Sequence, residues 1–571
     1  MSPIPIARHR AGGDAVLIGP AGAVGAAVFF AQAARLARAL PEGERVINLC
    51  ETRHGFMLGY AAALLRGQVS LLPPGRGRGD WEALLRRYPG AQVLGERPIA
   101  GADTFAIGAF LEDLSLGRAE TGAFEIPAID ANAIAAILFT SGSTGEPAAH
   151  AKTWGQLCRG AALLARALGW EARPAGAIIG SVPPQHMFGL EATVMLPWQS
   201  GVPVHAHEPL LAADLRAALG ECGRPAWWMT TPMHLRAPLQ ATAELPGLQG
   251  VVASTMSLPA ALARAAEAAW RVPVFEVYGS TETGALATRR TASEDAWSPL
   301  PGVVLHAHGE GEAQRFRAEG PHIDPPVVLG DVLAPQPDGR FLWLGRASDM
   351  VKVGGKRASL TALDIALTEI PGVVDGAFAF PPDARDGEGE SHPARRLAAF
   401  FVSETLDAPR VLVALRARID STFLPRPLHR VARLPRNANG KLPRSAMAEL
   451  FAQCQPAQAI AAGHPALPGH FPGDQRVPGV TLLARVAEAL RARFPHCVPG
   501  ELLHARFHIA LRPGEPFAIE ARREQGLARF EVRRAPREGP APAVVASGEA
   551  GAVIASGEWA LHGADPGEPR A

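Results

Sequence analysis

The chain has 571 residues, with 56 basic and 55 acidic side chains and a net charge of +1. It is too long for a single hydrophobic core, so we expect three or four domains. No basic tract points to nucleic acid, and no long block of one charge points to a disordered tail. The five scattered cysteines form no CxxC pair, which favours reduced thiols in a cytoplasmic protein without a disulfide framework or zinc site.

The first apolar stretch is AVLIGPAGAVGAAVFFAQAA (15–34). A membrane span or signal peptide needs such a run, but Pro20 and three glycines interrupt it, so we expect no span. The same stretch partly matches a dinucleotide-binding fingerprint, although its glycine spacing is wrong for G-x-G-x-x-G. We favour a strand, a turn and a buried helix, and a nicotinamide oxidoreductase that uses Gly19–Gly25 stays as an alternative.

Strand-like and helix-like runs alternate up to about residue 345. The strand-like runs are RVINLC, QVSLLP, AIAAILF, AGAIIGSVP, VPVHAH, PAWWMTT, LQGVVAS and PVFEVYG. This alternation predicts an α/β domain with a largely parallel sheet. Residues 350–450 repeat the mixture on a smaller scale, with the strand-like AFAFP and LAAFFV on either side of a polar stretch that we expect to be an exposed loop.

The C-terminal part has a different composition. We interpret FAQCQPAQAIAAG (451–463) as a linker. One apolar helix, GVTLLARVAEALRARF, is followed by the strand-like ARFHIAL, PFAIEARR, ARFEVRR and AVIASGEWAL. A helix that is apolar nearly all round should be wrapped by these strands. The tail, 563–571, should be loose.

The stretch TSGSTGEP (140–147) follows the apolar run AIAAILF directly. Successive glycine and hydroxyl residues after a strand can turn backbone N–H groups and hydroxyls into one anion-binding concavity. The residues concerned are Thr140, Ser141, Gly142, Ser143, Thr144 and Gly145. The pattern is not that of a Walker A loop, and taken alone it also fits an ordinary strand-to-helix turn.

Four further motifs follow in a fixed order: VYGSTETGALATR (277–289), LGD (329–331), GRASDMVKVGGKR (345–357) and LPRNANGKLPR (434–444). Together with the first loop they resemble the adenylate-forming superfamily of acyl-CoA synthetases, aryl-acid ligases and peptide-synthetase adenylation domains. The resemblance covers about residues 10–450. It implies a large domain, 1–347, and a small mobile domain, 348–450, hinged at Asp349.

The resemblance also implies ATP and Mg²⁺ as partners of a carboxylic acid substrate. Because the acid and the phosphates are both anionic, donors and cations should converge on the phosphates. By the resemblance, the 140–145 loop surrounds the β- and γ-phosphates, Thr281 contacts the α-phosphate, and Glu282 holds Mg²⁺. Asp331 binds the ribose with help from Arg346, and Tyr278 flanks the adenine. Lys441 bridges the substrate carboxylate and the α-phosphate.

One position departs from the pattern of the family. Its loop usually continues Pro-Lys-Gly, where this chain has Ala148 and Ala149 after the proline. Lys152 could swing back towards the loop or be a solvated helix lysine. We expect weaker ATP binding but a working reaction, because the charge at the α-phosphate belongs to Lys441.

The acid-binding residues implied by the resemblance are His186 in VPPQHMFGL, Ser254 and Met256 in ASTMSLP, and Gly279. Thr255 and Met256 stand where the family often has two glycines, which suggests a small or flat acid, either aryl or short and unsaturated. His186 could instead make a structural hydrogen bond.

After the adenylate forms, the small domain of the family rotates and presents its GGKR segment (354–357) to a thiol. That thiol would belong to CoA or to the phosphopantetheine of an acyl carrier protein. Lys356 and Arg357 suit a CoA phosphate or an acidic carrier and do not distinguish between them.

The segment HPALPGHFPGDQRVPGVTLLARV (464–486) resembles β-hydroxyacyl-carrier dehydratases of the hot-dog fold, over residues 464–562. The resemblance implies that His470 removes a proton, that a backbone N–H near Gly479 polarises the thioester carbonyl, and that two copies form a dimer. The usual acid position is Ala484, with Glu488 one helical turn further on. This leaves an active dehydratase, an altered activity or an inactive acyl-binding fold.

The combined prediction is an ATP-dependent acid–thiol ligase fused to a dehydratase-like module, which would suit the synthesis of an unsaturated acyl or aryl polyene chain. A degenerate scaffold that binds acyl carriers without ligase turnover is the alternative.

Overall fold

The computed structural model describes residues 2–115, 125–140, 148–309, 315–353, 356–380, 397–436, 442, 444–454, 458–468, 475–493, 498–524, 527–534 and 553–562. The chain divides into two compact units. One consists of Met1–Phe378 with Ala399–Lys441, and the other of Ala379–Ala398 with Leu442–Ala571.

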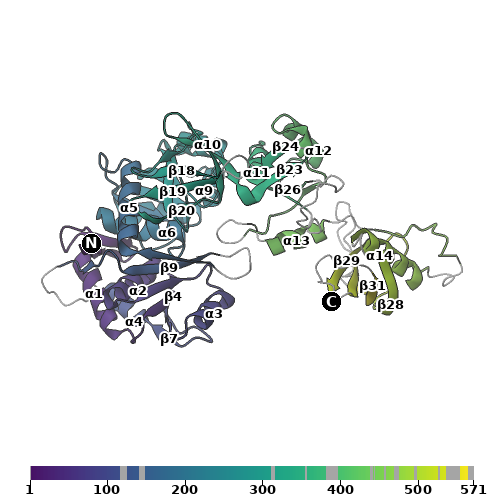
Figure 1. Cartoon of the computed structure of the whole chain (residues 1–571), viewed down its shortest axis with the longest axis horizontal. Coiled ribbons are helices and arrows are strands. Elements are labelled where there is room, and N and C mark those ends of the chain that lie inside the picture. Colours follow the sequence, from purple (N-terminus) through teal and green to yellow (C-terminus); the bar gives the residue numbers. More distant parts are fainter. Residues whose placement is uncertain are drawn as a thin grey trace. The chain divides into compact units, whose positions relative to one another are not determined.

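The first unit runs from purple to green in Figure 1, and its largest sheet has nine strands. Its inner pairs, from β2 to β15, are parallel, and its outermost pairs are antiparallel. In spatial order the strands are β17 (Ser298–Pro299), β16 (Gly284–Arg289), β15 (Val274–Ser280), β14 (Leu248–Ala253), β13 (Ala226–Thr230), β11 (Ala177–Gly180), β12 (Val204–His205), β2 (Ala15–Gly19) and β3 (Gly22–Gly25).

A six-stranded sheet accompanies it, and only its edge strand β10 is antiparallel. Its order is β10 (Ala148–Thr153), β9 (Ile134–Thr140), β5 (Val69–Leu72), β4 (Arg45–Asn48), β6 (Gln92–Gly95) and β7 (Thr104–Ala106). Each strand-like run predicted from RVINLC to PVFEVYG is a strand in one of these sheets. The predicted mixed α/β fold with largely parallel sheet is therefore confirmed.

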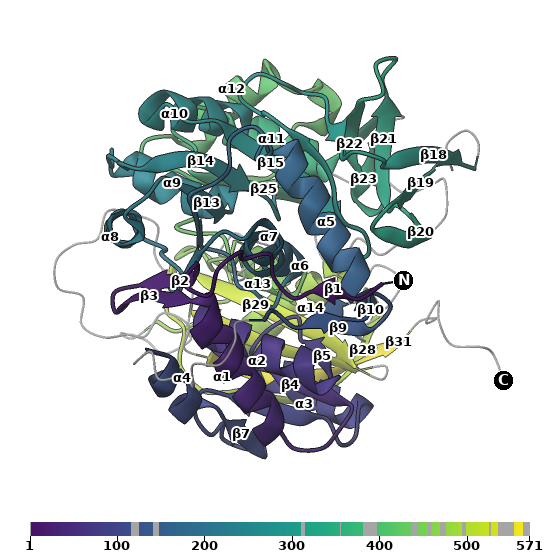
Figure 2. The same ribbon diagram turned by 90° about the vertical axis from the view of Figure 1, so that its left-hand side faces the viewer.

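Helices cover both sheets, and α1 and α2 lie side by side (Figure 2), with α1 against β2 and β3 and α2 against β4 and β5. Large aromatic side chains fill the core below them, with the rings of Tyr60 and Trp198 stacked 6.0 Å apart. The helices are α1 (Ala26–Ala39), α2 (Arg53–Arg66), α3 (Arg78–Arg87), α4 (Gly108–Ser115), α5 (Trp154–Ala167), α6 (Met187–Leu190), the π-helix η1 (Glu191–Met195), α7 (Leu196–Ser200), α8 (Ala212–Cys222), α9 (Pro232–Gln240) and α10 (Ala260–Trp270).

The glycine-rich stretch near the N-terminus forms a β-hairpin. β2 and β3 pair antiparallel, Gly22 in the turn has a φ of 107°, and α1 begins only at Ala26. A dinucleotide fingerprint needs a parallel strand that leads straight into a helix, so the oxidoreductase interpretation loses its structural basis. Among the described residues, no helix is long and apolar enough to cross a membrane.

Small sheets complete the first unit. Their elements are β1 (Ile4–Pro5) with β8 (Ala128–Ile129), β18 (Val304–His308), β19 (Arg315–Gly320) and β20 (Ile323–Val328), β21 (Asp331–Pro335) with β22 (Phe341–Arg346), β23 (Met350–Val353) with β24 (Lys356–Ser359), and β25 (Asp375–Ala379), β26 (Ala398–Val402) and β27 (Leu428–Arg430), joined by η3 (Ala347–Asp349), α11 (Leu360–Thr368), α12 (Ala408–Arg416) and η4 (Ser421–Phe423).

The second unit contains α13 (Arg444–Gln453), α14 (Gly479–Arg493) and an antiparallel sheet in the order β28 (Val498–Phe507), β31 (Val553–His562), β30 (Leu527–Arg534) and β29 (Phe517–Glu524). α14 lies against this sheet (Figure 1) and buries Leu482, Val486 and Leu490. Its other face is open, with Val480 74% exposed, so the described strands cover one side of the helix instead of wrapping it. In the stretch predicted as a linker, Gln458 forms a β-bridge with Phe517.

Candidate active site

The candidate site lies where β9 and β15 end. Ligands of open α/β sheets commonly bind outside the carboxyl ends of the parallel strands. β9 ends at Thr140, and β15 ends at Ser280, directly before Thr281 and Glu282. The turn then continues into β16, with Gly284 at a φ of 73°.

The Glu282 carboxylate is linked to the end of β9 through His150. His150 Nε2 lies 3.5 Å from Glu282 Oε1 and 3.2 Å from the Thr140 hydroxyl. Burial alone would raise the pKa of Glu282, but the Ser280 hydrogen bond and the charges of His150 and Arg346 hold it below its usual value. Its side chain is 42% exposed. Glu282 therefore presents an ionised carboxylate to solvent.

That carboxylate is chemically suited to Mg²⁺, a cation that binds through one or two carboxylates and takes its other ligands from water and phosphate oxygens. Over the described ranges no group of three or more His, Cys, Asp or Glu side chains could hold a metal ion.

A second polar cluster surrounds Asp331, the first residue of β21. The Tyr278 hydroxyl donates to Oδ2 at 2.8 Å, Trp343 Nε1 donates to Oδ1 at 3.0 Å, and Arg346 Nε lies 3.9 Å from Oδ1. Burial and then the charge of Asp331 raise the pKa of Tyr278, so the phenol keeps its proton. Each carboxylate oxygen retains acceptor capacity for a further hydroxyl.

These two clusters bring together five residues that the sequence singled out: Thr140, Tyr278, Glu282, Asp331 and Arg346. Arg346 belongs to both, since its charge acts on Glu282 as well as on Asp331. The residues come from four strands and one turn spread over about 200 positions, and their convergence depends on the sheet.

One of the two sequence-based alternatives for Lys152, a solvated lysine on a helix, is wrong. Lys152 is in β10, which pairs with β9, and helix α5 begins only after the Thr153 cap. Lys152 is 5% exposed and donates to the backbone carbonyl of Glu282. Burial lowers its pKa, while Glu191 and Glu282 act in the opposite direction. The ammonium is therefore engaged below the Glu282 turn.

The residues predicted to bind the acid have mixed environments. The Ser254 hydroxyl donates to the Val277 carbonyl at 2.9 Å, which ties β14 to β15, and Met256 is half-buried. A Cβ on Gly279 would lie 2.2 Å from the Gly284 carbonyl, so only glycine fits there. His186 is half-buried and caps α6 at its N-terminus. Thr255 has a φ of 76°, a left-handed conformation that is strained for a β-branched residue.

Several predicted residues lie outside the described part of the chain, namely Ser141, Gly142, Ser143, Thr144, Gly145, Lys441 and His470. Asp349 ends the 3-10 helix η3, directly before β23. The Lys356 ammonium donates to Asp420 Oδ2 at 2.5 Å, so this lysine is already paired with an acid of the same unit.

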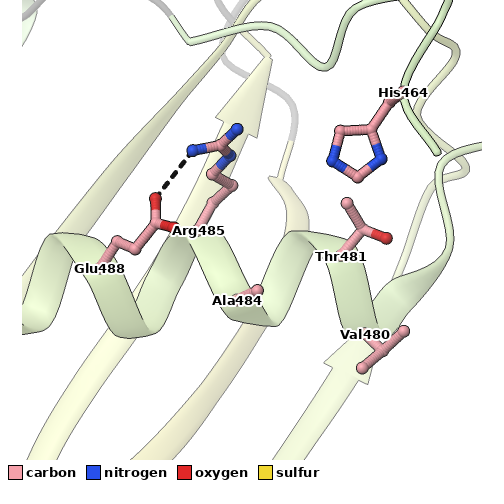
Figure 3. Close-up of a pocket in the computed structure, with 6 residues that line it drawn as sticks. All are labelled: His464, Val480, Thr481, Ala484, Arg485 and Glu488. Atoms are coloured by element: carbon pink, nitrogen blue, oxygen red, sulfur yellow. Dashed lines mark hydrogen bonds and ion pairs between the residues drawn. The ribbon is translucent and has the colours of Figure 1, made fainter. Parts of the chain in front are cut away.

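The second unit has a pocket of about 290 Å³ along α14, lined by His464, Val480, Thr481, Ala484, Arg485 and Glu488 (Figure 3). Ala484 and Glu488 line the same space, one turn apart, as their spacing predicted. Glu488 Oε2 accepts a hydrogen bond from Arg485 at 2.8 Å. Gly479 begins the helix, and a Cβ on it would lie 2.6 Å from the Phe507 ring.

Sequence reasoning missed three residues that hold the site. Glu191 (3% exposed) accepts from the backbone N–H of Ala285, His322 bonds the carbonyl of Ala285, and Trp343 bonds Asp331. A glutamate inside the apolar run MFGLEATVML was the available signal, because a carboxylate there must find a partner.

The comparisons with known proteins agree with this architecture. The family model of AMP-binding enzymes matches residues 93–309. A 4-coumarate–CoA ligase of Rhodobacter capsulatus is 34% identical over 300 residues, which cover 52% of this chain and 71% of the relative. A probable 2-succinylbenzoate–CoA ligase of Mycobacterium tuberculosis is 29% identical over 343 residues, covering 56% and 85%.

Solved structures show the same fold. ATP-bound MatB from Rhodopseudomonas palustris has a TM-score of 0.65 at 21% identity and covers 78% of this chain and 97% of its own. The o-succinylbenzoate CoA synthetase of Bacillus subtilis, in complex with its acyl-adenylate, has a TM-score of 0.64 at 19% identity, with coverage of 76% and 95%. On the extent and identity of the match to the R. capsulatus ligase, this chain belongs to the adenylate-forming superfamily of AMP-binding enzymes.

Proposed function

We propose that the chain uses ATP to activate a small carboxylic acid as its acyl-adenylate, releases pyrophosphate, and transfers the acyl group to the thiol of CoA or of a carrier phosphopantetheine. The observation that carries this proposal is the convergence of Glu282, Tyr278, Asp331 and Arg346 at the end of β15. CoA ligases among the relatives and acyl-adenylate in a related structure support the reaction class.

In the proposed site, Asp331 accepts hydrogen bonds from the ribose hydroxyls while Tyr278 and Trp343 fix its carboxylate. Tyr278 also flanks the adenine, and its own ring is held by Trp297 and Phe341 at 5.5 and 5.6 Å. Glu282 would hold Mg²⁺, which would neutralise phosphate charge. Thr281 donates to the α-phosphate, and the 140–145 loop receives the β- and γ-phosphates.

The carboxylate of the acid attacks the α-phosphorus, and pyrophosphate leaves. This chain contributes mainly position and charge compensation, because phosphoryl chemistry of this kind needs little covalent help from the protein. Lys441 is proposed to bring its ammonium between the two anions. The thiol then attacks the acyl carbonyl, and AMP leaves.

Acid-dependent pyrophosphate release tests this function. A panel of aryl and short unsaturated acids is offered to the full chain with ATP and Mg²⁺, and Lys441→Ala is the control. We expect release with at least one acid and a loss of at least about 100-fold in the variant, since the lysine acts on transition-state charge. No release with any acid, or equal release by the variant, contradicts the proposal.

A second candidate function concerns the second unit, for which we propose a dehydratase-like module that binds a β-hydroxyacyl thioester. The helix–sheet arrangement and the pocket along α14 support this proposal (Figure 3). Ala484 has no proton to transfer, and Glu488 is the carboxyl group that lines the same pocket. The Glu488 carboxylate accepts a hydrogen bond from Arg485 through Oε2, which leaves Oε1 for a substrate.

The test offers a β-hydroxyacyl-carrier thioester to the full chain and follows the 2-enoyl product. Formation of product that Glu488→Gln abolishes supports dehydration through Glu488. Unchanged thioester that nevertheless binds supports an inactive acyl-binding module, and absence of binding contradicts both versions. The same protein, analysed for mass in solution, tests the proposed homodimer.

A further inference from the structure

The turn that carries Glu282 is held from behind by three side chains that are distant in sequence. Lys152 Nζ donates to the carbonyl of Glu282. Glu191 Oε2 accepts from the backbone N–H of Ala285 at 3.1 Å, and His322 Nε2 donates to the carbonyl of Ala285 at 2.7 Å. β10, η1 and the residue before β20 therefore each bind a main-chain group of the segment 282–285, which runs from the turn into β16.

This cluster is buried and closely fitted. Lys152, Glu191 and His322 are 5%, 3% and 3% exposed. A Cβ on Gly284 would lie 2.5 Å from Glu191 Oε1, and a Cβ on Gly160 would lie 3.2 Å from the same atom. At Gly284, which also has a positive φ of 73°, a side chain would force Glu191 to move, whereas one at position 160 would need only a small shift. Buried charges are retained only where they are compensated and hydrogen-bonded, and the charges of Lys152 and Glu191 each favour the ionised form of the other.

All three side chains bind main-chain groups and leave the Glu282 carboxylate free of them. The bonded groups belong to the main chain of Glu282 and of Ala285 in β16, while the Glu282 side chain contacts His150 and is 42% exposed. Because these bonds fix the main chain on both sides of Gly284, they set the direction in which the Glu282 side chain leaves the backbone. Hydrogen-bond partners behind a metal ligand commonly set its orientation in this way.

We propose that Lys152, Glu191 and His322 form a turn clamp, a set of positioning residues that holds the main chain around Glu282 so that its carboxylate can bind Mg²⁺. The inference rests on the proposed function. It also accounts for the buried lysine of β10, because the charge of Lys152 holds the metal-binding turn from below. The lysine that is usual in the preceding loop would instead be at position 148.

The test measures binding at equilibrium and does not depend on turnover. ATP is titrated calorimetrically into the full chain, once with Mg²⁺ and once with EDTA, for the wild type and for Lys152→Met. We expect the variant to bind ATP about 10-fold more weakly with Mg²⁺, whereas its metal-free ATP binding stays within about twofold, because loss of a supporting group acts on the metal.

Gln32→Met is the matched control. Gln32 is 1% exposed and donates to the Phe110 carbonyl at 2.8 Å, a buried bond from side chain to backbone in another part of the first unit. Its loss should lower the melting temperature without changing either ATP titration. If Lys152→Met shows the same pattern as this control, the clamp is merely structural and the inference is wrong.

A double variant covers the case in which Lys152→Met fails to fold. Lys152→Met/Glu191→Gln removes both buried charges and keeps an oxygen that accepts from Ala285. We expect it to regain thermal stability and still bind ATP weakly with Mg²⁺, and wild-type affinity in this variant overturns the inference. If the wild type itself binds no ATP, the proposed function fails; if the wild type binds and the variants match it, only the clamp fails.

Discussion

Removal of the Tyr278 hydroxyl isolates one contact in the proposed nucleotide site. Tyr278→Phe keeps the ring between Trp297 and Phe341 and deletes the 2.8 Å hydrogen bond to Asp331 Oδ2. The carboxylate keeps its bond from Trp343 at 3.0 Å but loses the partner that fixes its other oxygen. The variant therefore changes the orientation of Asp331 more than its charge.

The size of the effect follows from the environment. A hydrogen bond to a charged group is worth about 1.5 to 3 kcal/mol, and because water can replace the lost donor at a partly exposed site we expect about 1 to 2 kcal/mol of destabilisation. If about 1 kcal/mol of that loss falls on ribose binding, the KM for ATP rises about fivefold. The KM for the acid should not change.

The assay is pyrophosphate release with ATP varied at saturating acid, together with thermal unfolding. Tyr88→Phe is a matched control, because this half-buried tyrosine packs on Phe139 away from Asp331. Asp331→Asn should weaken ATP more than Tyr278→Phe does, since it also removes the charge. An unchanged ATP KM in both site variants, or a change in the acid KM instead, would refute the assignment of Asp331 to the ribose.

Three further predictions concern other parts of the first unit. Thr255→Gly should relieve about 1 to 2 kcal/mol of left-handed backbone strain, offset by about 0.5 to 1 kcal/mol from the greater entropy of glycine in the unfolded chain. The melting temperature should therefore rise slightly, and the variant should accept bulkier acids. If the range of accepted acids does not change, this segment does not limit the pocket. Ala148→Lys, at an exposed position that pairs with Thr140, should lower the KM for ATP about fivefold, or roughly 1 kcal/mol, and an unchanged KM counts against a role for the missing lysine. Burial raises the pKa of Asp364 to about 7, against the hydrogen bond from Phe378 and the charge of Arg436, with Asp375 and Asp349 adding to the rise. The folded state therefore holds a proton that the unfolded state releases near pH 4. The free energy of unfolding should fall by up to about 4 kcal/mol as pH rises from about 4 to 7. The melting temperature of Asp364→Asn should lack this decrease, and parallel pH profiles for variant and wild type would contradict the prediction.

The strands of the two large sheets were predictable because buried parallel strands are short, continuous apolar runs between turn residues. AIAAILF and AGAIIGSVP are such runs, and both are strands. The hairpin at Gly22 was not predictable from the same signal, since GAVG is as compatible with the start of a helix as with a second strand. The choice is made by pairing with β2, which periodicity along one segment does not contain.

Only some residues of the candidate site could be predicted from the sequence. Glu282, Tyr278 and Asp331 stand in motifs whose order pointed to a common site, and the structure brings them together with Arg346. Glu191 and His322 stand in no such motif. Their role depends on tertiary contacts with the backbone of Ala285, so only the folded chain reveals it.

The position of Lys152 follows from strand geometry once β10 is known. Alternate residues of a strand face the same side, so His150 and Lys152 both point to the Glu282 turn, one to its side chain and the other to its carbonyl. A helix at this place would have turned them about 200° apart. The replacement of the loop lysine and the burial of Lys152 are thus separate matters: position 148 is exposed beside the loop, whereas position 152 lies inside the unit. A lysine restored at 148 should therefore add to the clamp instead of substituting for it, and the effects of Ala148→Lys and Lys152→Met on ATP binding should be additive in free energy.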